Sequence, residues 1–279
     1  MPWYTRTVAV LAFCIAFAPV IGAQWPSYPT PDVPRKDGKP ILDAPAPRTA
    51  DGKVDFSGIW QRAGGGGGGR GRGAAPTPPP PGTPPLSTFG EVAGRGYELP
   101  LQPWAAELKK KRMADNSKDN PDVWCLPIGL MQYHNHPQPR QIVQTKNLML
   151  ITYESNYGLR YIYLDGRPAP NNDPTPWWFG YSRGWFEGDT LVVETTNFRG
   201  DERAGWLDVN GSPYTDALKM TERFRRPNFG SLEIDVTIDD PKAYTKPFTV
   251  RVNWRLYPEQ QLIEFICNEN EKSTEHIAK

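Results

Sequence analysis

Strict alternation of apolar and polar residues dominates the C-terminal half of the chain. Every second residue is apolar from Leu232 to Ile238, and the segment from Phe248 to Leu256 repeats the pattern. A period of two places the apolar side chains of a strand on one face. Both segments are therefore predicted to be strands with one buried face.

The same reasoning predicts a long series of strands. Lys146-Asn147 and Glu187-Gly188-Asp189 have the length and composition of tight hairpin turns. Strands are expected around 56–60 and over 140–145, 148–154, 159–165, 181–186, 190–198, 218–227, 231–240, 248–258 and 262–269. A meander this long tends to close, because closure removes its exposed edges. The prediction is an all-β fold, an antiparallel up-and-down meander that closes into a lipocalin-like barrel of eight to ten strands. A twisted open sheet or a sandwich is the alternative.

One short helix is predicted ahead of the barrel strands, over residues 100–116. Pro103 suits a first helical turn, and Trp104, Leu108 and Met113 recur at roughly helical spacing. The basic run Lys109–Arg112 is interpreted as the solvated face of this helix. Basic residues near a helix C-terminus also suit the helix dipole.

The N-terminal segment indicates export. Residues 1–23 join a short polar start to an apolar run and end on small residues, as in a cleaved signal peptide; an uncleaved membrane anchor is the alternative. We therefore expect a periplasmic or secreted protein without a transmembrane segment after cleavage. A proline-rich arm follows over 24–50. Residues 51–279 are expected to form one barrel domain, with a disordered Gly/Pro-rich insertion at 62–85.

Export changes the interpretation of the cysteines. Cleavage would leave Cys125 and Cys267, and two cysteines in an oxidising compartment most simply form one disulfide. Two buried free thiols or half of a metal site are the alternatives. The formal net charge of +1 gives no electrostatic footprint for nucleic acid. The chain has no phosphate-binding glycine motif and no CxxC pair, so no cofactor is predicted.

Glu222 is the most informative candidate for chemistry. By alternation it shares a strand face with Leu218, Met220 and Phe224, which turns its carboxyl group toward the apolar interior. A carboxylate there is costly unless it is paired, and burial would raise its pKa. It is therefore a candidate catalytic acid or base. A structural pairing with an inward arginine such as Arg183 would explain it as well.

Two of the three histidines, His134 and His136, stand beside Tyr133 and are followed by two prolines. The prolines indicate a loop, which would line the mouth of the barrel. A histidine there is a candidate acid or base near neutral pH. The His-x-His spacing also occurs in metal sites, but a third ligand is not visible nearby, and no metal is predicted. Histidines without a chemical role remain the plain alternative.

Aromatic residues suggest where a ligand would lie. Trp177 and Trp178 are adjacent and cannot both face one core of a regular strand, so this pair and Tyr181 are expected to border a pocket. Further candidate ligand contacts are Tyr133, Arg183, Asp208 and Asp216, and Tyr214 is a candidate catalytic phenol. A plainer alternative is that Asp208 caps the turn at Asn210-Gly211 and that Asp216 caps the next element.

The run from "IYLDGRPAP" through "GYSRGWFEGDTLVVETTNF" to "FICNENEK" resembles an uncharacterised family of secreted proteins from soil bacteria with a "GRWEGDTLVV"-like hairpin. The resemblance covers roughly residues 48–61 and 100–279. It implies an all-β secreted protein and no established reaction. Family members often carry histidines where this chain has Ala169, Tyr181 and Tyr214. Gly58-Ile59-Trp60 adds a weaker similarity to the Gly-x-Trp strand of lipocalin-like barrels.

Three functions are compatible with these features. The first is binding of a small apolar or aromatic ligand inside the barrel. The alternative is an acid–base enzyme (isomerase, lyase or hydrolase) that uses Glu222, a histidine and Tyr181 or Tyr214 in the same pocket. The second alternative is an interaction protein of the cell envelope that uses the proline-rich arm and an exposed Trp177-Trp178 patch. The sequence indicates neither the ligand nor an oligomeric state.

Overall fold

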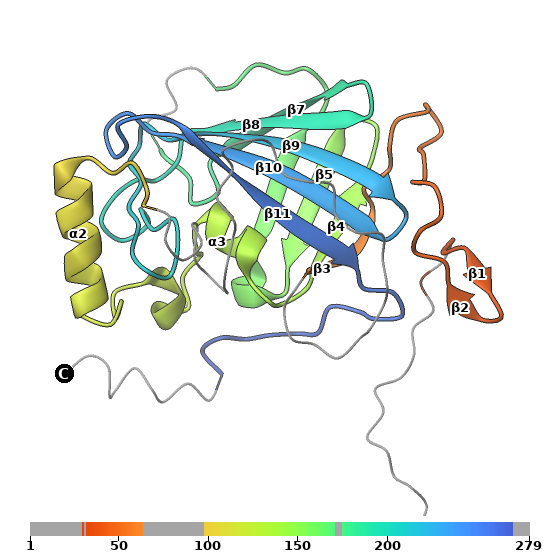
Figure 1. The fold of residues 1–279 in the computed structure, drawn as a ribbon, viewed down its shortest axis with the longest axis horizontal. Coiled ribbons are helices and arrows are strands. Elements are labelled where there is room, and N and C mark those ends of the chain that lie inside the picture. The colour runs from red at the N-terminus through yellow and green to blue at the C-terminus, as the bar shows by residue number, and fades with distance from the viewer. Residues whose placement is uncertain (1–29, 31, 64–97, 171–174, 270–279) are drawn as a thin grey trace, which may run out of the picture.

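The alternating segments pair in chain order around a closed ring (Figure 1). The computed structural model describes residues 30, 32–63, 98–170 and 175–269. The nine strands of the barrel are β3 (Gly58–Arg62), β4 (Arg140–Gln144), β5 (Leu148–Tyr153), β6 (Leu159–Tyr163), β7 (Tyr181–Glu187), β8 (Thr190–Thr196), β9 (Lys219–Asn228), β10 (Ser231–Asp239) and β11 (Phe248–Leu256). The predicted all-β barrel is confirmed.

One pair of neighbouring strands differs from the predicted meander. Strands β6 and β7 run parallel, with Ile162 opposite Ser182 and Tyr163 opposite Arg183, whereas the other pairs in the ring are antiparallel. An odd number of strands cannot alternate direction around a closed ring. A nine-strand barrel therefore contains at least one parallel pair, and the long connection between β6 and β7 supplies it.

Alternation fills the barrel from within. Inward side chains of neighbouring strands are fully buried, among them Ile151 of β5, Ile234 of β10 and Val250 of β11. Trp60 of β3 is also fully buried; its indole Nε1 donates to the Phe56 carbonyl over 2.9 Å. These apolar layers make a continuous core of the kind that period-two strands predict.

The prediction of a last strand over 262–269 was wrong. Strand β11 pairs with β3, so the ring is already closed when the chain leaves it near Tyr257, whose N–H donates to the Ile59 carbonyl. The following segment has no regular hydrogen-bonding partner and lies along the outside of the barrel. The predicted disulfide is confirmed: Cys125 and Cys267 are bonded, with Cα atoms 5.5 Å apart, and this bond ties the tail to the region before β4.

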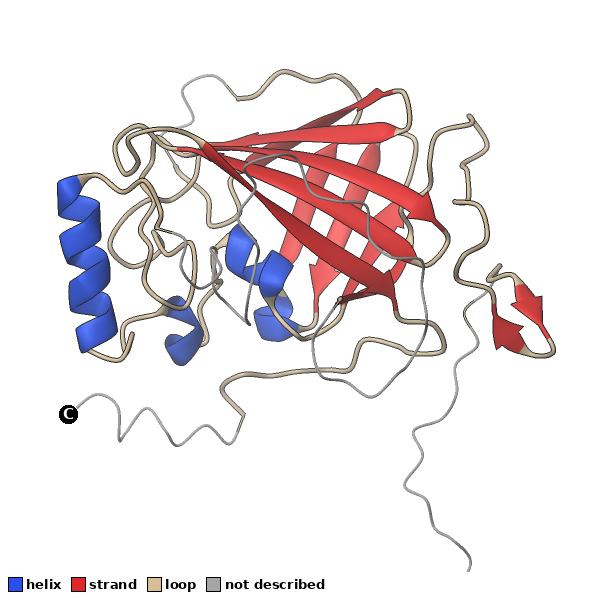
Figure 2. Ribbon diagram, viewed as in Figure 1, coloured by secondary structure: helices blue, strands red, loops and turns tan. Residues whose placement is uncertain are grey.

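The helices lie to one side of the barrel, opposite the small hairpin of β1 (Arg35–Lys36) and β2 (Lys39–Pro40) (Figure 2). They are α2 (Pro103–Ala114), η1 (Pro121–Trp124), α3 (Leu130–Asn135) and η2 (Ser155–Tyr157). The position of α2 was predicted, but its buried face was not. Trp104 and Met113 are 45% and 51% exposed, whereas Arg112, expected in solvent, is only 8% exposed. The Arg112 guanidinium donates hydrogen bonds to backbone carbonyls of residues 202, 205 and 211, which explains why it is buried.

The described part of the proline-rich arm, from residue 32 onward, packs on the surface of the barrel. It contains the small hairpin β1 (Arg35–Lys36) and β2 (Lys39–Pro40). Beyond the hairpin, the carbonyls of Leu42 and Ala44 accept the N–H groups of Gly230 and Phe229 at 2.7 Å, which covers the turn between β9 and β10. The predicted signal peptide, and the predicted insertion from residue 64 onward, lie outside the described residues. Within the described ranges, no helix is long and apolar enough to cross a membrane.

Candidate functional site

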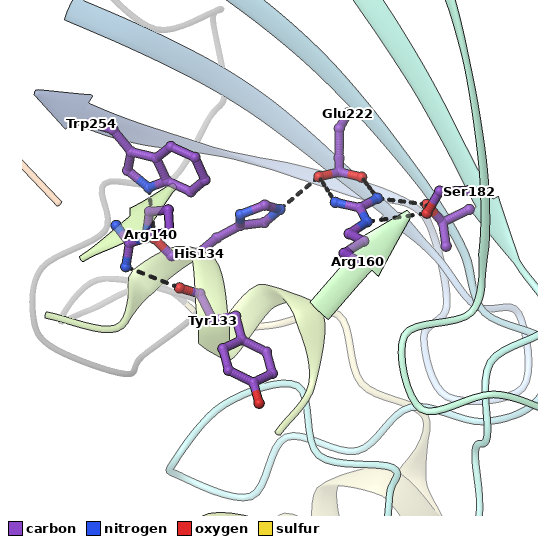
Figure 3. Close-up of polar contacts among 8 residues, drawn as sticks. Tyr133, His134, Arg140, Arg160, Ser182, Glu222 and Trp254 are labelled. Atoms are coloured by element: carbon purple, nitrogen blue, oxygen red, sulfur yellow. Dashed lines mark hydrogen bonds and ion pairs between the residues drawn. The ribbon is translucent and has the colours of Figure 1, made fainter. Parts of the chain in front are cut away.

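A buried polar network joins helix α3 to the inner wall of the barrel (Figure 3). The imidazole Nε2 of His134, on α3, lies 2.6 Å from the Oε1 atom of Glu222, on β9. Arg160, on β6, donates from Nη1 to the same oxygen over 2.9 Å and from Nη2 to Oε2. All three side chains are at most 1% exposed. Glu222 is therefore enclosed by one cation and one imidazole.

Two hydroxyl groups complete the surroundings of the Arg160 guanidinium. Its Nε donates to Ser182 Oγ on β7 over 3.1 Å, and its Nη2 donates to Thr195 Oγ1 on β8 over 2.8 Å. The two hydroxyl oxygens are 2.9 Å apart. These residues meet because alternation turns one polar side chain inward from each of three neighbouring strands. Saturation of this kind offsets much of the cost of burying a charge pair.

The network fixes the protonation of its members. Burial raises the pKa of the Glu222 carboxyl group, but the charge and hydrogen bonds of Arg160 and the hydrogen bond from His134 outweigh burial and lower the pKa to about 2. Burial lowers the pKa of His134, and Glu222 offsets this only in part. At neutral pH the pair is therefore a carboxylate and a neutral imidazole whose Nε2–H donates to it. The lone pair of the buried Nδ1 has no hydrogen-bond partner among the described residues.

A second buried arginine, Arg140 of β4, lies on the other side of His134. Its guanidinium is 4.7 Å from the ring centre of Trp254, whose Nε1 donates to the His134 carbonyl over 2.9 Å. The His134 and Trp254 rings are also in contact, with centroids 5.3 Å apart. Burial lowers the pKa of Arg140 to about 10, which keeps it charged at neutral pH. Trp254 thus contacts both the Arg140 guanidinium and the His134 ring.

The structure brings two predicted site residues together and separates others. Glu222 and His134 are in contact, as the acid–base hypothesis requires. The expected partner Arg183 instead binds Glu194 on the outside of the barrel over 2.8 Å, and Arg160 takes its place at Glu222. His134 belongs to a helix, not to the predicted loop. His136 follows that helix, and its Nε2 lies 3.8 Å from Asp122.

Tyr133, a predicted ligand contact, and Tyr214, a predicted catalytic phenol, lie in apolar packing. The Tyr133 ring is 4.5 Å from the Tyr153 ring and 5.5 Å from the Phe179 ring, measured between centroids. Tyr214 packs against Phe198 at 5.8 Å, in the loop ahead of β9. Burial raises the pKa of both Tyr133 and Tyr214. Both hydroxyls therefore stay protonated at neutral pH.

The aromatic cluster around Trp177 lies on the outside of the barrel. Ser182 points inward, so its strand neighbour Tyr181 points outward, where its ring is 5.2 Å from the Tyr163 ring and 5.5 Å from the Trp177 ring. Trp177 is 40% exposed, and the Arg199 guanidinium is 5.1 Å from the Trp178 ring. These side chains form an external aromatic cluster, and they do not border the barrel interior.

The two aspartates of the loop ahead of β9 have structural contacts. Asp208 is 2% exposed and accepts hydrogen bonds from the backbone N–H and the hydroxyl of Ser212, both over 2.9 Å. It caps the turn, as the plainer alternative predicted. Asp216 lies at the surface and binds Lys242 over 2.7 Å. The predicted capping role for Asp216 is taken by Asp240, which accepts from the Thr215 N–H over 2.6 Å.

A cavity of about 450 Å³ lies outside the barrel, between α2, η1 and the loop 202–206. Trp124 and Trp206 form aromatic walls, and Leu108 and Arg112 of α2 form another side. The Arg112 guanidinium lies 3.9 Å from the ring centre of Trp206. None of the ligand contacts predicted from the sequence borders this cavity, which we call the α2 pocket.

The charges around the α2 pocket are incompletely paired. Its lining includes four basic residues and three acidic ones, an excess of one positive charge. Among the described residues, Lys111, Lys118 and Arg203 form no ion pair within 4.0 Å, and all three are exposed. Exposed cations beside aromatic walls offer contacts to a ligand at little desolvation cost.

Sequence reasoning missed Arg160, Arg140 and the α2 pocket. A signal existed for both arginines, because Arg160 alternates with Ile162, and Arg140 with Ile142, on strands whose inner faces were predictable. The pocket gave no comparable signal, since two stretches that lie far apart in the sequence, 108–124 and 202–206, meet to form it. No cluster of three or more His, Cys, Asp or Glu residues suited to a metal ion occurs in the described part of the chain. The chain matches no family model, no curated protein and no solved structure.

Proposed function

We propose that the chain is an exported binding protein, and that its ligand occupies the α2 pocket. The observation that carries this proposal is the cavity itself, whose 450 Å³ falls within the usual range for small-molecule sites. The Cys125–Cys267 disulfide supports export, because such bonds persist in oxidising compartments. The resemblance of the β7–β8 hairpin to secreted proteins of soil bacteria points the same way.

The aromatic walls favour a flat apolar or aromatic ligand. The indole Nε1 of Trp124 donates to the Lys118 carbonyl over 3.1 Å, and that of Trp206 donates to the Glu202 carbonyl over 3.2 Å. Both indole N–H groups are therefore occupied, and Trp206 is only 1% exposed, so the ring face of Trp124 is what the walls offer. Arg112 covers one face of Trp206, while Trp124 is 39% exposed. Trp124 is the surface on which we expect a ligand to stack.

The charges favour an anionic group on that ligand. Lys111, Lys118 and Arg203 surround the aromatic walls, and the buried Arg112 adds a fixed charge behind them. Arg112 remains charged at neutral pH, because burial lowers its pKa only to about 10. An aromatic carboxylate matches both the ring faces and the excess positive charge.

The barrel interior supports ligand binding less well than the α2 pocket. Its inner wall is made of side chains such as Trp60, Tyr153 and Phe224, each at most 3% exposed. Helix α3 is buried along its whole length at one end of the barrel. The sequence suggested a ligand inside the barrel. We propose instead that the ligand binds outside it.

Isothermal titration calorimetry with indole-3-acetate, indole and tryptamine tests this proposal. We expect indole-3-acetate to bind most tightly and tryptamine, which is cationic, most weakly. Trp124→Ala should weaken indole-3-acetate binding about tenfold, the equivalent of one stacked aromatic contact. Trp185→Ala is the matched control, because Trp185 is similarly exposed, at 45%, on the distant β7 strand. Equal affinities of the two variants would refute the α2 pocket as the site.

One observation favours a second function, acid–base catalysis inside the barrel. Glu222 orients His134 and leaves the Nδ1 lone pair without a partner, which is the arrangement of a carboxylate-oriented general base. This function requires the barrel end near α3 to open, since His134 is fully buried. Diethyl pyrocarbonate modification followed by mass spectrometry tests it. Acylation of His134 at a rate similar to that of an exposed histidine would support catalysis, and protection up to global unfolding would exclude it.

A further inference from the structure

The charges inside the barrel do not balance. Glu222 is the carboxylate of the interior network, and Arg160 neutralises it at hydrogen-bond distance. Arg140 adds a second positive charge at 1% exposure, with no carboxylate within ion-pair distance among the described residues. After burial, which lowers the pKa of Arg140, Tyr153 and, more weakly, the carboxylate of Glu154 raise it; the Glu154 Oε2 also accepts the Ile263 N–H. Arg140 is thus a buried positive charge without an ion-pair partner in the described part of the chain, and such a charge is costly.

The hydrogen bonds of Arg140 are incomplete as well. Its Nη2 donates to the carbonyls of Tyr133, His136 and Gln138, at 3.3, 2.6 and 2.8 Å. Its Nε and Nη1 are buried and have no partner in the described part of the chain. A buried charged N–H group without an acceptor destabilises the folded state.

Arg226 shows what a completed site of this kind looks like in the same molecule. It is 5% exposed, and its guanidinium lies 4.8 Å from the Trp60 ring centre, as Arg140 does with Trp254. Every nitrogen of Arg226 has an acceptor: Nε and Nη2 donate to the Phe229 carbonyl, and Nη1 donates to those of Asp55 and Ser57. The two arginines share burial and an aromatic neighbour, and they differ in the two unsatisfied nitrogens of Arg140.

We propose that the barrel holds a small anion at Arg140, bound by Nε or Nη1 next to Trp254. An anion satisfies both deficits together, since it accepts a hydrogen bond and neutralises the surplus charge, whereas water would supply only the first. Trp60 and Tyr153 lie opposite Arg140 on the neighbouring strands, and both are buried, as are the two nitrogens. We therefore expect the anion to be among the smallest, such as a halide or formate. This site is separate from the α2 pocket and does not depend on the function proposed for it.

Bromide provides a direct test on the wild-type protein. Crystals grown in sodium bromide should show an anomalous peak within hydrogen-bond distance of Arg140 Nε or Nη1, and no such peak at Arg226. In solution, the melting temperature should rise with bromide concentration at constant ionic strength, because an ion that binds the folded state stabilises it by mass action. The absence of a peak at Arg140 in well-ordered crystals would overturn the proposal.

A matched pair of variants separates this site from general salt effects. Arg140→Gln should abolish the dependence of the melting temperature on bromide, whereas Arg226→Gln should retain it. If Arg140→Gln does not fold, the anomalous measurement on the wild type still decides. Lys118→Ala removes a cation of the α2 pocket and should leave the bromide dependence unchanged. Loss of the dependence in Lys118→Ala, with retention in Arg140→Gln, would place the anion in the α2 pocket and refute the interior site.

Discussion

The interior network and the α2 pocket each combine arginine with tryptophan, yet they differ in how their charges are satisfied. Inside the barrel, Arg160 meets a carboxylate and two hydroxyls, and exposure is at most 1%. In the pocket, Arg112 donates to backbone carbonyls, and the cations around it are exposed and unpaired within the described residues. The interactions of the first arrangement stabilise the fold, whereas the exposed cations of the second are free to contact the ligand that we propose.

The largest difference between the two regions should appear on removal of one carboxylate from each. Glu222→Gln leaves Arg160 buried without its counter-charge, and we expect a loss of about 3–5 kcal/mol in the free energy of unfolding. Glu202→Gln, in the exposed wall of the pocket, should change it by less than about 0.5 kcal/mol. Urea unfolding followed by far-UV circular dichroism measures both. Equal losses in the two variants would contradict the distinction.

Loss of the disulfide should lower the free energy of unfolding nearly as much as Glu222→Gln does, and it should affect mainly the α2 pocket. Cys125 directly follows the pocket wall residue Trp124 and holds the C-terminal tail through Cys267. Replacing both cysteines by serine should cost about 2–5 kcal/mol in unfolding free energy. It should also weaken binding of indole-3-acetate, because the position of Trp124 is no longer fixed. Unchanged affinity in the double variant would show that the wall is held by other contacts.

Two neighbouring residues of α2 provide a smaller and more local comparison. Arg112→Met leaves the carbonyls of Glu202, Gly205 and Gly211 without their donor, with an expected loss of about 1–3 kcal/mol in unfolding free energy. Lys111→Met removes an exposed charge and should have an effect below about 0.5 kcal/mol. Urea unfolding measures the free energy of unfolding of both variants. A larger effect at Lys111 would mean that the helix is anchored differently from the contacts described above.

The smallest expected effect is a pH dependence that belongs to the interior alone. The pKa of His134 is lowered in the folded chain, so the unfolded chain binds more protons as the pH falls through the ordinary histidine value of 6.5. Folding free energy is therefore lost from that point downward. The stability that Glu222 contributes is present above its ordinary pKa of 4.5 and is lost as the pH falls toward about 2.

His134→Gln isolates the first of these contributions. It should flatten the fall in unfolding free energy between pH 6.5 and 5.5 by up to about 1.4 kcal/mol per pH unit, the limit for one proton. Urea midpoints measured from pH 7.5 to 4.5 test this. A variant with the slope of the wild type would assign the pH dependence to groups other than His134.

The sequence predicted those parts of the molecule that depend on local periodicity. Strands such as β10 and β11 alternate strictly over nine residues each, and turn signals separate β4 from β5 and β7 from β8. Helix α3 was missed because six residues are too few to show a helical period, and its polar residues Gln132, His134 and Asn135 are buried with the apolar ones. The adjacent prolines pointed to a loop instead.

The site was predictable only in part, for a related reason. Alternation placed Glu222 inside the barrel, and the same alternation places Arg160 there. Which arginine meets the carboxylate depends on the closure of the ring, which brings β6 opposite β9, and no local pattern encodes that closure. The α2 pocket depends even more on tertiary structure, because a helix, a short turn and a distant loop supply its walls.

Strand β3 has a consequence for how the protein folds and how it can misassemble. It pairs through three residues with β11 and three with β4, whereas β10 and β11 share eight pairs. The other eight strands neighbour one another along the chain and can assemble as an open sheet. Strand β3 is the first of the barrel strands to be synthesised, yet we expect it to dock last and close the ring. Until then the edges of β4 and β11 stay open to other chains, so a truncated protein beginning after β3 should form aggregates.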